Sequence, residues 1–286
     1  MSRLVKMRFP GGLDKALTLS YDDDTRHNIR LVEILNRYGI KATFNLNFGL
    51  FAQEPTANTL TLNEAKSLFA GGPHEVAIHG YKHLSLGRVP DPTGMQDLIL
   101  DRAAAEEAFG PFVRGMAYAN GAFNDKTGEL LDKCGVVYSR TTRSTRAFDF
   151  PADWRYLHPT CHHKDPQLFD LADAFLGEKI YRDAKMFYLW GHAYEFNNDQ
   201  NWDLIEEFCE KFKDQPVWFA TNMEIYEYVK AFEGLVYSLD GETVYNPSCR
   251  DVYFALCRPW GTFEPVLGVV KAGQKLDLTL LLEGTR

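Results

Sequence analysis

Three consecutive carboxylates near the N-terminus are the residues best suited to chemistry. Residues 17–21 suit a buried strand and run directly into Asp22, Asp23 and Asp24. Because adjacent carboxylates repel one another, we expect a cation among them. Successive strand residues face opposite ways, so Asp22 and Asp23 can serve one site only if the chain leaves the strand between them. The alternative is a solvated turn in which Asp24 caps the following helix.

Two histidines offer matching ligands. His79 and His83 are four residues apart, a spacing that would stack both imidazoles on one turn of helix. One Asp and two His suffice to hold a divalent ion that keeps an open position for water. The sequence therefore predicts a metal site, although a purely structural histidine pair has the same spacing. His74 precedes the strand expected over residues 75–78 and should lie at its opposite end.

Further histidines follow later in the chain. His192 comes directly after a strand expected over residues 186–190 and fits a general acid with a pKa near neutrality. The alternative is a core histidine, or one that supports another site residue. His162 and His163 lie in an irregular segment, residues 140–165. Adjacent residues do not readily bind one metal, so we expect at most one of them to line the pocket.

The elements that must position these residues alternate between strand-like and helical patterns. The expected strands are 16–20, 40–46, 75–78, 112–118, 136–139, 186–190 and 216–221, with helices over 26–37, 62–69, 95–109, 124–133, 166–175, 201–212 and 222–232. Strands alternating with helices predict an α/β fold with a parallel sheet, closed or nearly closed into a barrel. Residues 1–15 are expected to be a lead-in with a turn at residues 10–12.

The pattern changes after residue 234. A hairpin over residues 235–245 and strand-like runs at 252–256, 266–270 and 276–282 predict a small antiparallel β appendage. We therefore expect two domains, a barrel over residues 1–234 and the appendage over 235–286.

Composition sets the class of protein. The 286 residues are 45% hydrophobic and 24% charged, with a net charge of −8, which indicates a soluble enzyme without a nucleic-acid or membrane partner. Five cysteines without a C-x-x-C pair, and no apolar run typical of a signal peptide or membrane span, predict a cytoplasmic protein with reduced thiols. The oligomeric state stays open, a homo-oligomer included.

Five short motifs carry a family resemblance. They are Ser20-Tyr21-Asp22-Asp23, His79-Gly80-Tyr81-Lys82-His83, Ala117-Tyr118-Ala119-Asn120-Gly121, Asp153-Trp154 and Leu189-Trp190-Gly191-His192. In order and spacing they are similar to the T-F-D-D, H-[ST]-x-x-H, R-P-P-Y-G, D-W and L-x-L-H motifs of one family. Over residues 16–232 the sequence thus resembles the NodB-like polysaccharide deacetylases, carbohydrate esterase family 4.

The resemblance implies a distorted (β/α)7 barrel of the TIM type that holds one Zn²⁺, or Co²⁺ or another divalent ion. By matching position, Asp23, His79 and His83 would bind the metal. Asp22 would act as the general base and His192 would protonate the leaving amine.

The resemblance also suggests the substrate side of the site. The backbone N–H of Asn120 would help to hold the oxyanion, with Tyr118 and Trp154 beside the substrate. The implied activity is removal of acetyl groups from a carbohydrate, N-acetyl rather than O-acetyl.

Departures from the family pattern indicate an atypical cytosolic branch that acts on an acetylated mono- or oligosaccharide. The arginine of the third motif aligns with Ala117, and Arg114, Arg140 or Arg143 could supply the missing charge; Arg143 is the preferred candidate. Two other functions stay open. One is hydrolysis of another non-peptide C–N bond, in a cyclic imide or ureide, and the other is a non-catalytic sugar-binding barrel.

Overall fold

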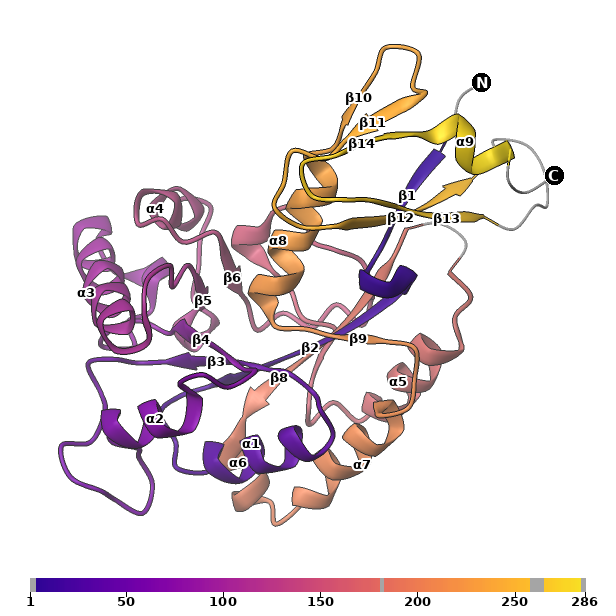
Figure 1. Ribbon diagram of the computed structural model, residues 1–286. Helices are drawn as coiled ribbons and strands as arrows, with labels where there is room; N and C mark the ends of the chain where they lie inside the picture. Colours follow the sequence, from indigo (N-terminus) through magenta and orange to yellow (C-terminus); the bar gives the residue numbers. More distant parts are fainter. Residues whose placement is uncertain (1–3, 181–182, 258–264, 284–286) are drawn as a thin grey trace.

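A curved parallel sheet forms the centre of the chain (Figure 1). The computed structural model describes residues 4–180, 183–257 and 265–283. The strand order of the parallel sheet is β6-β5-β4-β3-β2-β8-β7, and β9 also pairs with β2. The strands are β2 (Lys15–Asp22), β3 (Thr43–Leu46), β4 (Glu75–Ile78), β5 (Gly115–Ala117), β6 (Tyr138–Arg140), β7 (Cys161–His162), β8 (Lys185–His192) and β9 (Trp218–Phe219). With β6 and β7 at its edges, the sheet is an open half-barrel, so the expected distorted (β/α)7 fold is confirmed.

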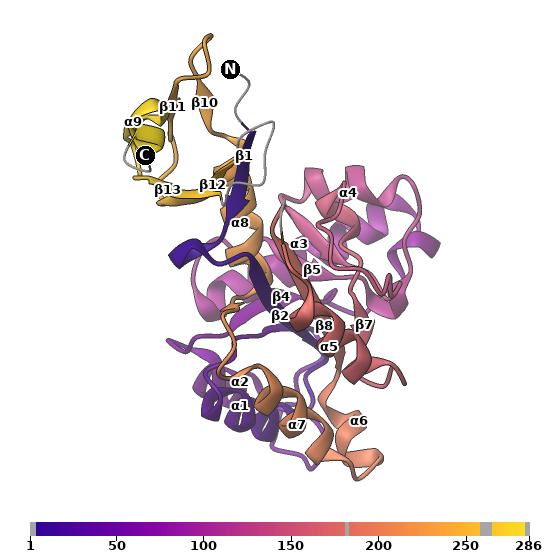
Figure 2. The same cartoon turned by 90° about the vertical axis from the view of Figure 1, so that its right-hand side faces the viewer.

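Helices connect the strands and cover the outside of the sheet (Figures 1 and 2). They are α1 (Asn28–Arg37), α2 (Leu62–Phe69), α3 (Asp91–Phe109), α4 (Thr127–Lys133), α5 (Leu168–Gly177), α6 (Ala193–Asn198), α7 (Trp202–Phe212) and α8 (Asn222–Glu233). Helix α1 shows how a helix attaches, because Leu31 and Leu35 share one face and are fully buried in the main core. The described residues also contain four 3₁₀ turns: η1 (Pro10–Gly12), η2 (Leu86–Arg88), η3 (Ala119–Gly121) and η4 (Trp154–Tyr156).

Strand β2 is buried along its whole length and separates two environments. Leu17, Leu19 and Tyr21 belong to the main hydrophobic core. The intervening residues are polar: Thr18 donates to Asn222, and Ser20 accepts from Asn45. Because side chains alternate along a strand, Asp22 continues this polar row into the barrel interior.

A separate antiparallel region lies at one end of the molecule (Figure 1). β12 (Val252–Cys257) pairs with β13 (Val266–Val270), and β11 (Thr243–Tyr245) pairs with β10 (Val236–Tyr237) and β14 (Lys275–Asp277). The C-terminal β appendage is thus confirmed, while the division into domains at residue 234 stays a prediction. None of the described helices is long and apolar enough to span a membrane.

Two expectations about the chain ends were wrong. Residues 4–8 of the supposed lead-in form β1 (Leu4–Arg8), which pairs with β12, since Val5 packs on the core of the appendage. The apolar run at 276–282 is a strand only to Asp277 and continues as α9 (Leu278–Glu283). There the buried Leu278 packs into the same small core.

Candidate active site

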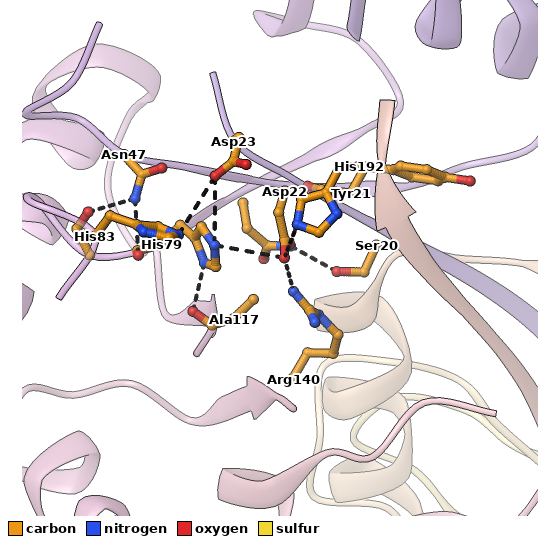
Figure 3. A network of polar contacts seen from close by, with 12 residues as sticks. Ser20, Tyr21, Asp22, Asp23, Asn47, His79, His83, Ala117, Arg140 and His192 are labelled. Carbon is orange, nitrogen blue, oxygen red and sulfur yellow. Dashed lines mark hydrogen bonds and ion pairs between the residues drawn. The ribbon is translucent and has the colours of Figure 1, made fainter. Parts of the chain in front are cut away.

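Polar side chains gather at the carboxyl ends of the parallel strands (Figure 3). Asp22 ends β2 and stands opposite His192 in the register with β8. His79 follows β4, and Arg140 ends β6. The carboxyl edge of a parallel sheet is where α/β enzymes place their sites, so this edge is the candidate active site.

Asp22 is a buried carboxylate with a partner on each oxygen. Its side chain is 3% exposed, and Asn45 Nδ2 donates to Oδ1 at 2.9 Å. Oδ2 accepts from the Arg140 guanidinium and lies 3.7 Å from His79 Nε2. Burial alone would raise the pKa of Asp22, but the charge of Arg140, together with His79 and His192, lowers it to about 2. Asp22 is therefore ionised at neutral pH and ready to accept a hydrogen bond or a proton.

Arg140 supplies the charge that the third motif lacks. It is fully buried, and its guanidinium lies 4.3 Å from the centre of the Trp190 ring. Contacts with a carboxylate on one side and an aromatic face on the other fix its plane. The preference for Arg143 was wrong, because Arg143 is exposed while Arg140 ends β6 inside the barrel.

Asp23 leaves the strand and joins the two histidines. Its φ of +74° ends β2, so Asp22 and Asp23 can face one site, as the sequence required. Asp23 Oδ1 lies 3.9 Å from His79 Nε2 and 3.8 Å from His83 Nε2. The expected helical turn is wrong. Gly80 (φ +90°) and His83 (φ +55°) form a tight loop, and this loop brings the two rings to a centroid distance of 4.8 Å.

These three side chains fit a divalent metal. His79 Nδ1–H donates to the carbonyl oxygen of Ala117 at 2.8 Å, which leaves the lone pair of Nε2 facing Asp23 and His83. Burial lowers the pKa of His79 and keeps the ring neutral, as metal binding requires. The ligand atoms of Asp23, His79 and His83 lie within 4.8 Å of one another. Two imidazoles and a carboxylate are a usual zinc ligand set.

A buried carboxylate holds the loop that carries the histidines. Asp101 of α3 is fully buried and accepts three backbone N–H groups, from Phe48 at 2.8 Å, His79 at 3.1 Å and Gly80 at 2.7 Å. Asn47 adds hydrogen bonds from Nδ2 to the carbonyls of His79 and Gly80. Burial raises the pKa of Asp101 to about 7. Asp101 thus fixes the loop on which both histidines stand.

His192 faces Asp22 across the site. Its Nε2 lies 3.8 Å from Asp22 Oδ2, and its Nδ1 is 3.1 Å from Glu195 Oε2. Burial opposes the charged ring, but the hydrogen bond to Glu195 and the charge of Asp22 outweigh it and raise the pKa of His192. Because Glu195 holds Nδ1, the proton on Nε2 is the one that can be transferred.

The remaining acid of the triplet has a structural role. Asp24 is buried, and its Oδ1 accepts from Asn47 N–H at 2.9 Å. Burial raises its pKa well above the usual range. The alternative of a solvated turn with Asp24 as a helix cap is therefore wrong. His74 lies at the opposite end of β4, as expected, where its Nδ1 accepts from Ala42 N–H.

The substrate residues suggested by the motifs are more scattered. Trp154 is buried in a second core cluster and packs edge-on against Tyr226, so the structure does not bring it into the site. Tyr118 is buried too, and its hydroxyl donates to the carbonyl of Arg155. Asn120 is exposed, with a φ of +58°, and its Nδ2 donates to Ser85 Oγ. Its part in holding an oxyanion stays a prediction.

An open pocket of about 500 Å³ adjoins the Asp–His cluster. Asp23 forms part of its wall, and Tyr194, whose ring lies 5.1 Å from that of His192, forms another part. The other lining residues are mostly polar: Asp24, Thr25, His27, Asn47, Leu50, Asn58, Thr59 and Asn198. Small-molecule sites span about 300–1,000 Å³, so this pocket can hold a ligand of a few rings.

Sequence reasoning missed several supporting residues. Glu195 stands three residues after His192 and forms a capping box at the start of α6, a local pattern that could have revealed it. Asp101 and Asn45 gave no such signal, because their partners are more than 20 residues away in the chain.

Comparison with known proteins agrees with this geometry. The family model described as "Polysaccharide deacetylase" matches residues 11–139, which contain Asp22, Asp23, His79 and His83. No curated protein matches the sequence significantly.

Solved structures share the fold at low sequence identity. A Mycobacterium smegmatis protein assigned as a polysaccharide deacetylase is 19% identical, with a TM-score of 0.57 over 80% of this chain and 94% of its own. The carbohydrate esterase family 4 domain of a xylanase from the hindgut metagenome of Trinervitermes trinervoides is 18% identical, with a TM-score of 0.51 over 76% and 92%. Peptidoglycan deacetylase PdaC from Bacillus subtilis, a point mutant, is 16% identical, with a TM-score of 0.50 over 77% and 94%. The chain is therefore similar to the polysaccharide deacetylases in sequence over residues 11–139 and shares the fold of these solved structures over most of its length.

Proposed function

We propose that this protein is a metal-dependent hydrolase that removes acetyl groups from a carbohydrate. The relation to polysaccharide deacetylases supports carbohydrate deacetylation. The observation that carries the finer proposal is the meeting of three groups at one strand edge: the ionised Asp22, the cluster of Asp23, His79 and His83, and His192. A base, a metal ligand set and an acid are the parts that hydrolysis of an amide needs.

The three ligands Asp23, His79 and His83 would hold one divalent ion, most simply Zn²⁺, with Co²⁺ as an alternative. When bound, such an ion supplies a Lewis acid that polarises the acetyl carbonyl and makes water more acidic.

The chain's own groups then divide the proton transfers. Asp22 accepts the proton of the attacking water, and Arg140 keeps this carboxylate ionised and fixed in direction. His192 gives its Nε2 proton to the leaving nitrogen, while Glu195 holds Nδ1 and favours the charged ring. An amine leaves only after protonation, whereas an alcohol leaves more readily, so a strongly supported acid favours N-acetyl over O-acetyl substrates.

The size of the adjoining pocket supports a short oligosaccharide as the substrate. Purified protein should release acetate from N-acetylated chitooligosaccharides, and it should not hydrolyse cyclic imides or ureides. Hydrolysis of an imide without acetate release would replace the proposed reaction with the second C–N hydrolysis. Binding of the sugar with neither reaction would favour the non-catalytic barrel.

The base assignment has its own test. The variant Asp22→Asn should keep the bound metal, because Asp22 is outside the proposed ligand set, and it should lose at least about 100-fold in kcat. Full turnover in this variant would refute the assignment of Asp22.

A further inference from the structure

A second cluster of ligand-type side chains lies behind the candidate active site. His162 ends β7, His163 follows it, and Glu195 belongs to α6. Glu195 Oε2 is 3.1 Å from His162 Nε2 and 3.4 Å from His163 Nε2. His163 N–H still donates to the Trp190 carbonyl as part of the β7–β8 ladder, and the chain turns directly afterwards, where Asp165 N–H donates to the His162 carbonyl. Both rings reach Glu195, contrary to the expectation for adjacent histidines.

The burial of the His163 ring without hydrogen bonds needs an explanation. Its side chain is fully buried against the rings of Phe196, at a centroid distance of 4.2 Å, and Tyr21, at 5.9 Å. Within the described part of the chain, neither of its ring nitrogens makes a hydrogen bond. Phenylalanine would fill this place without burying two unsatisfied nitrogens, which cost free energy. A ligand for Nε2 would remove half of that cost.

From this geometry we propose that His162, His163 and Glu195 form a second site for a zinc-like divalent cation. Bonds of about 2.0–2.2 Å to a tetrahedral ion separate its ligands by roughly 3.4 Å, close to the separations between Glu195 and each histidine. Two imidazoles and a carboxylate also match the preference of zinc, with one position left for water.

An ion beside Glu195 requires the other tautomer of His162, because Lys164 N–H donates to His162 Nδ1 at 3.1 Å and so places the ring proton on Nε2. Binding through Nε2 moves this proton to Nδ1 at the expense of that hydrogen bond. His192 Nδ1 and His192 N–H each lie 3.1 Å from Oε2 and hold the carboxylate in place, as partners of metal-binding carboxylates do. Lys164 lies at 3.3 Å from the other oxygen, Oε1, and its charge is shared with Asp199 at 2.7 Å. His162 is 21% exposed, which gives an ion a route from solvent.

The test is the number of zinc ions bound per chain at equilibrium with buffered free zinc. Wild-type protein should bind two. His163→Phe keeps a buried ring in contact with Tyr21 and Phe196 and should bind one fewer, as should His162→Gln at the partly exposed position. His158→Ala is the control, since His158 bonds to Thr141 and belongs to neither cluster.

The outcome separates the two sites. His83→Ala should also lose one ion, but from the first site, and its combination with His163→Phe should bind none. If His163→Phe and His162→Gln both bind as much zinc as wild type, the second site does not exist. If only His83→Ala leaves the stoichiometry unchanged, the second site stands and the first one fails. If His163→Phe does not fold, His162→Gln and an anomalous difference map of zinc-soaked crystals decide the question.

Discussion

The ion pair between Arg140 and Asp22 gives the sharpest prediction about the barrel interior. Both side chains are almost completely buried, at 0% and 3% exposure. Replacing Arg140 by Met keeps most of the volume but leaves Asp22 buried without its main counter-charge. The free energy of unfolding should therefore fall.

The structure sets the size of this loss. The pKa of Asp22 is lowered from an ordinary 3.8 to about 2, a difference of about 2.5 kcal/mol at 1.36 kcal/mol per pKa unit. Because the folded pKa is the lower one, this stability is present above pH 4 and is lost as the pH falls towards 2. Removing one partner of a buried pair costs about 3–5 kcal/mol, since the remaining charge stays desolvated. We expect Arg140→Met to lose about 3–5 kcal/mol at pH 7.

Urea unfolding in the presence of a chelator measures this loss without a contribution from bound metal. The exposed Arg143 is the matched control, and Arg143→Met should change stability by less than about 0.5 kcal/mol. The pair Arg140→Met with Asp22→Asn should recover a large part of the loss, because no buried charge is left. A loss below about 1 kcal/mol for Arg140→Met, or an equal loss for Arg143→Met, would refute the reasoning.

Three further predictions concern the histidines and the loop that carries two of them. Burial of His74, which is 8% exposed, lowers its pKa to about 4. As the pH falls, the unfolded chain therefore binds a proton at His74 before the folded chain does, so wild type should lose about 2 kcal/mol more stability than His74→Gln between pH 7 and pH 5 in urea unfolding. Parallel pH curves for the two proteins would contradict this. Asp101→Asn cannot accept the three N–H groups equally well and should weaken zinc binding at the first site about 10–100-fold in competition with a chromogenic chelator. Unchanged zinc affinity would show that the loop of His79 and His83 keeps its conformation without Asp101. His192→Gln should lower kcat for deacetylation by about 10²–10⁴-fold while the metal content stays the same, and loss of metal instead would move His192 into the ligand set.

Much of the fold follows from local patterns in the sequence. The alternation of strands and helices was enough to predict a parallel sheet, although the expected closed or nearly closed barrel is an open half-barrel. The run of acids after residue 21 pointed to the edge of the sheet that carries the candidate site. The end of β2 shows why this works: Asp22 and Asp23 could serve one site only if the strand ended between them, and the positive φ of Asp23 ends it. The spacing of His79 and His83 was informative for the pair but wrong for its backbone, because a tight loop through Gly80 brings two rings together as well as a helical turn does.

The errors came from contacts between distant parts of the chain. Strand β1 pairs with β12, which lies almost 250 residues later, and five residues alone cannot reveal that partner. Arg140 and Arg143 are three residues apart in a segment without a regular sequence pattern. Which of them points into the barrel depends on where β6 ends, and the sequence did not show this. The pairing of His162 and His163 with Glu195 likewise depends on a turn after β7 that the sequence pattern does not specify.

The most direct test of the central claim is acetate release from N-acetylated chitooligosaccharides during a zinc titration of chelated protein. If Asp23, His79 and His83 hold the catalytic ion, the chelated protein is inactive, wild type regains activity as zinc is added, and His83→Ala stays inactive at every zinc concentration. Full activity in the chelated protein, or recovery of His83→Ala to the level of wild type, would contradict the proposed metal-dependent deacetylase.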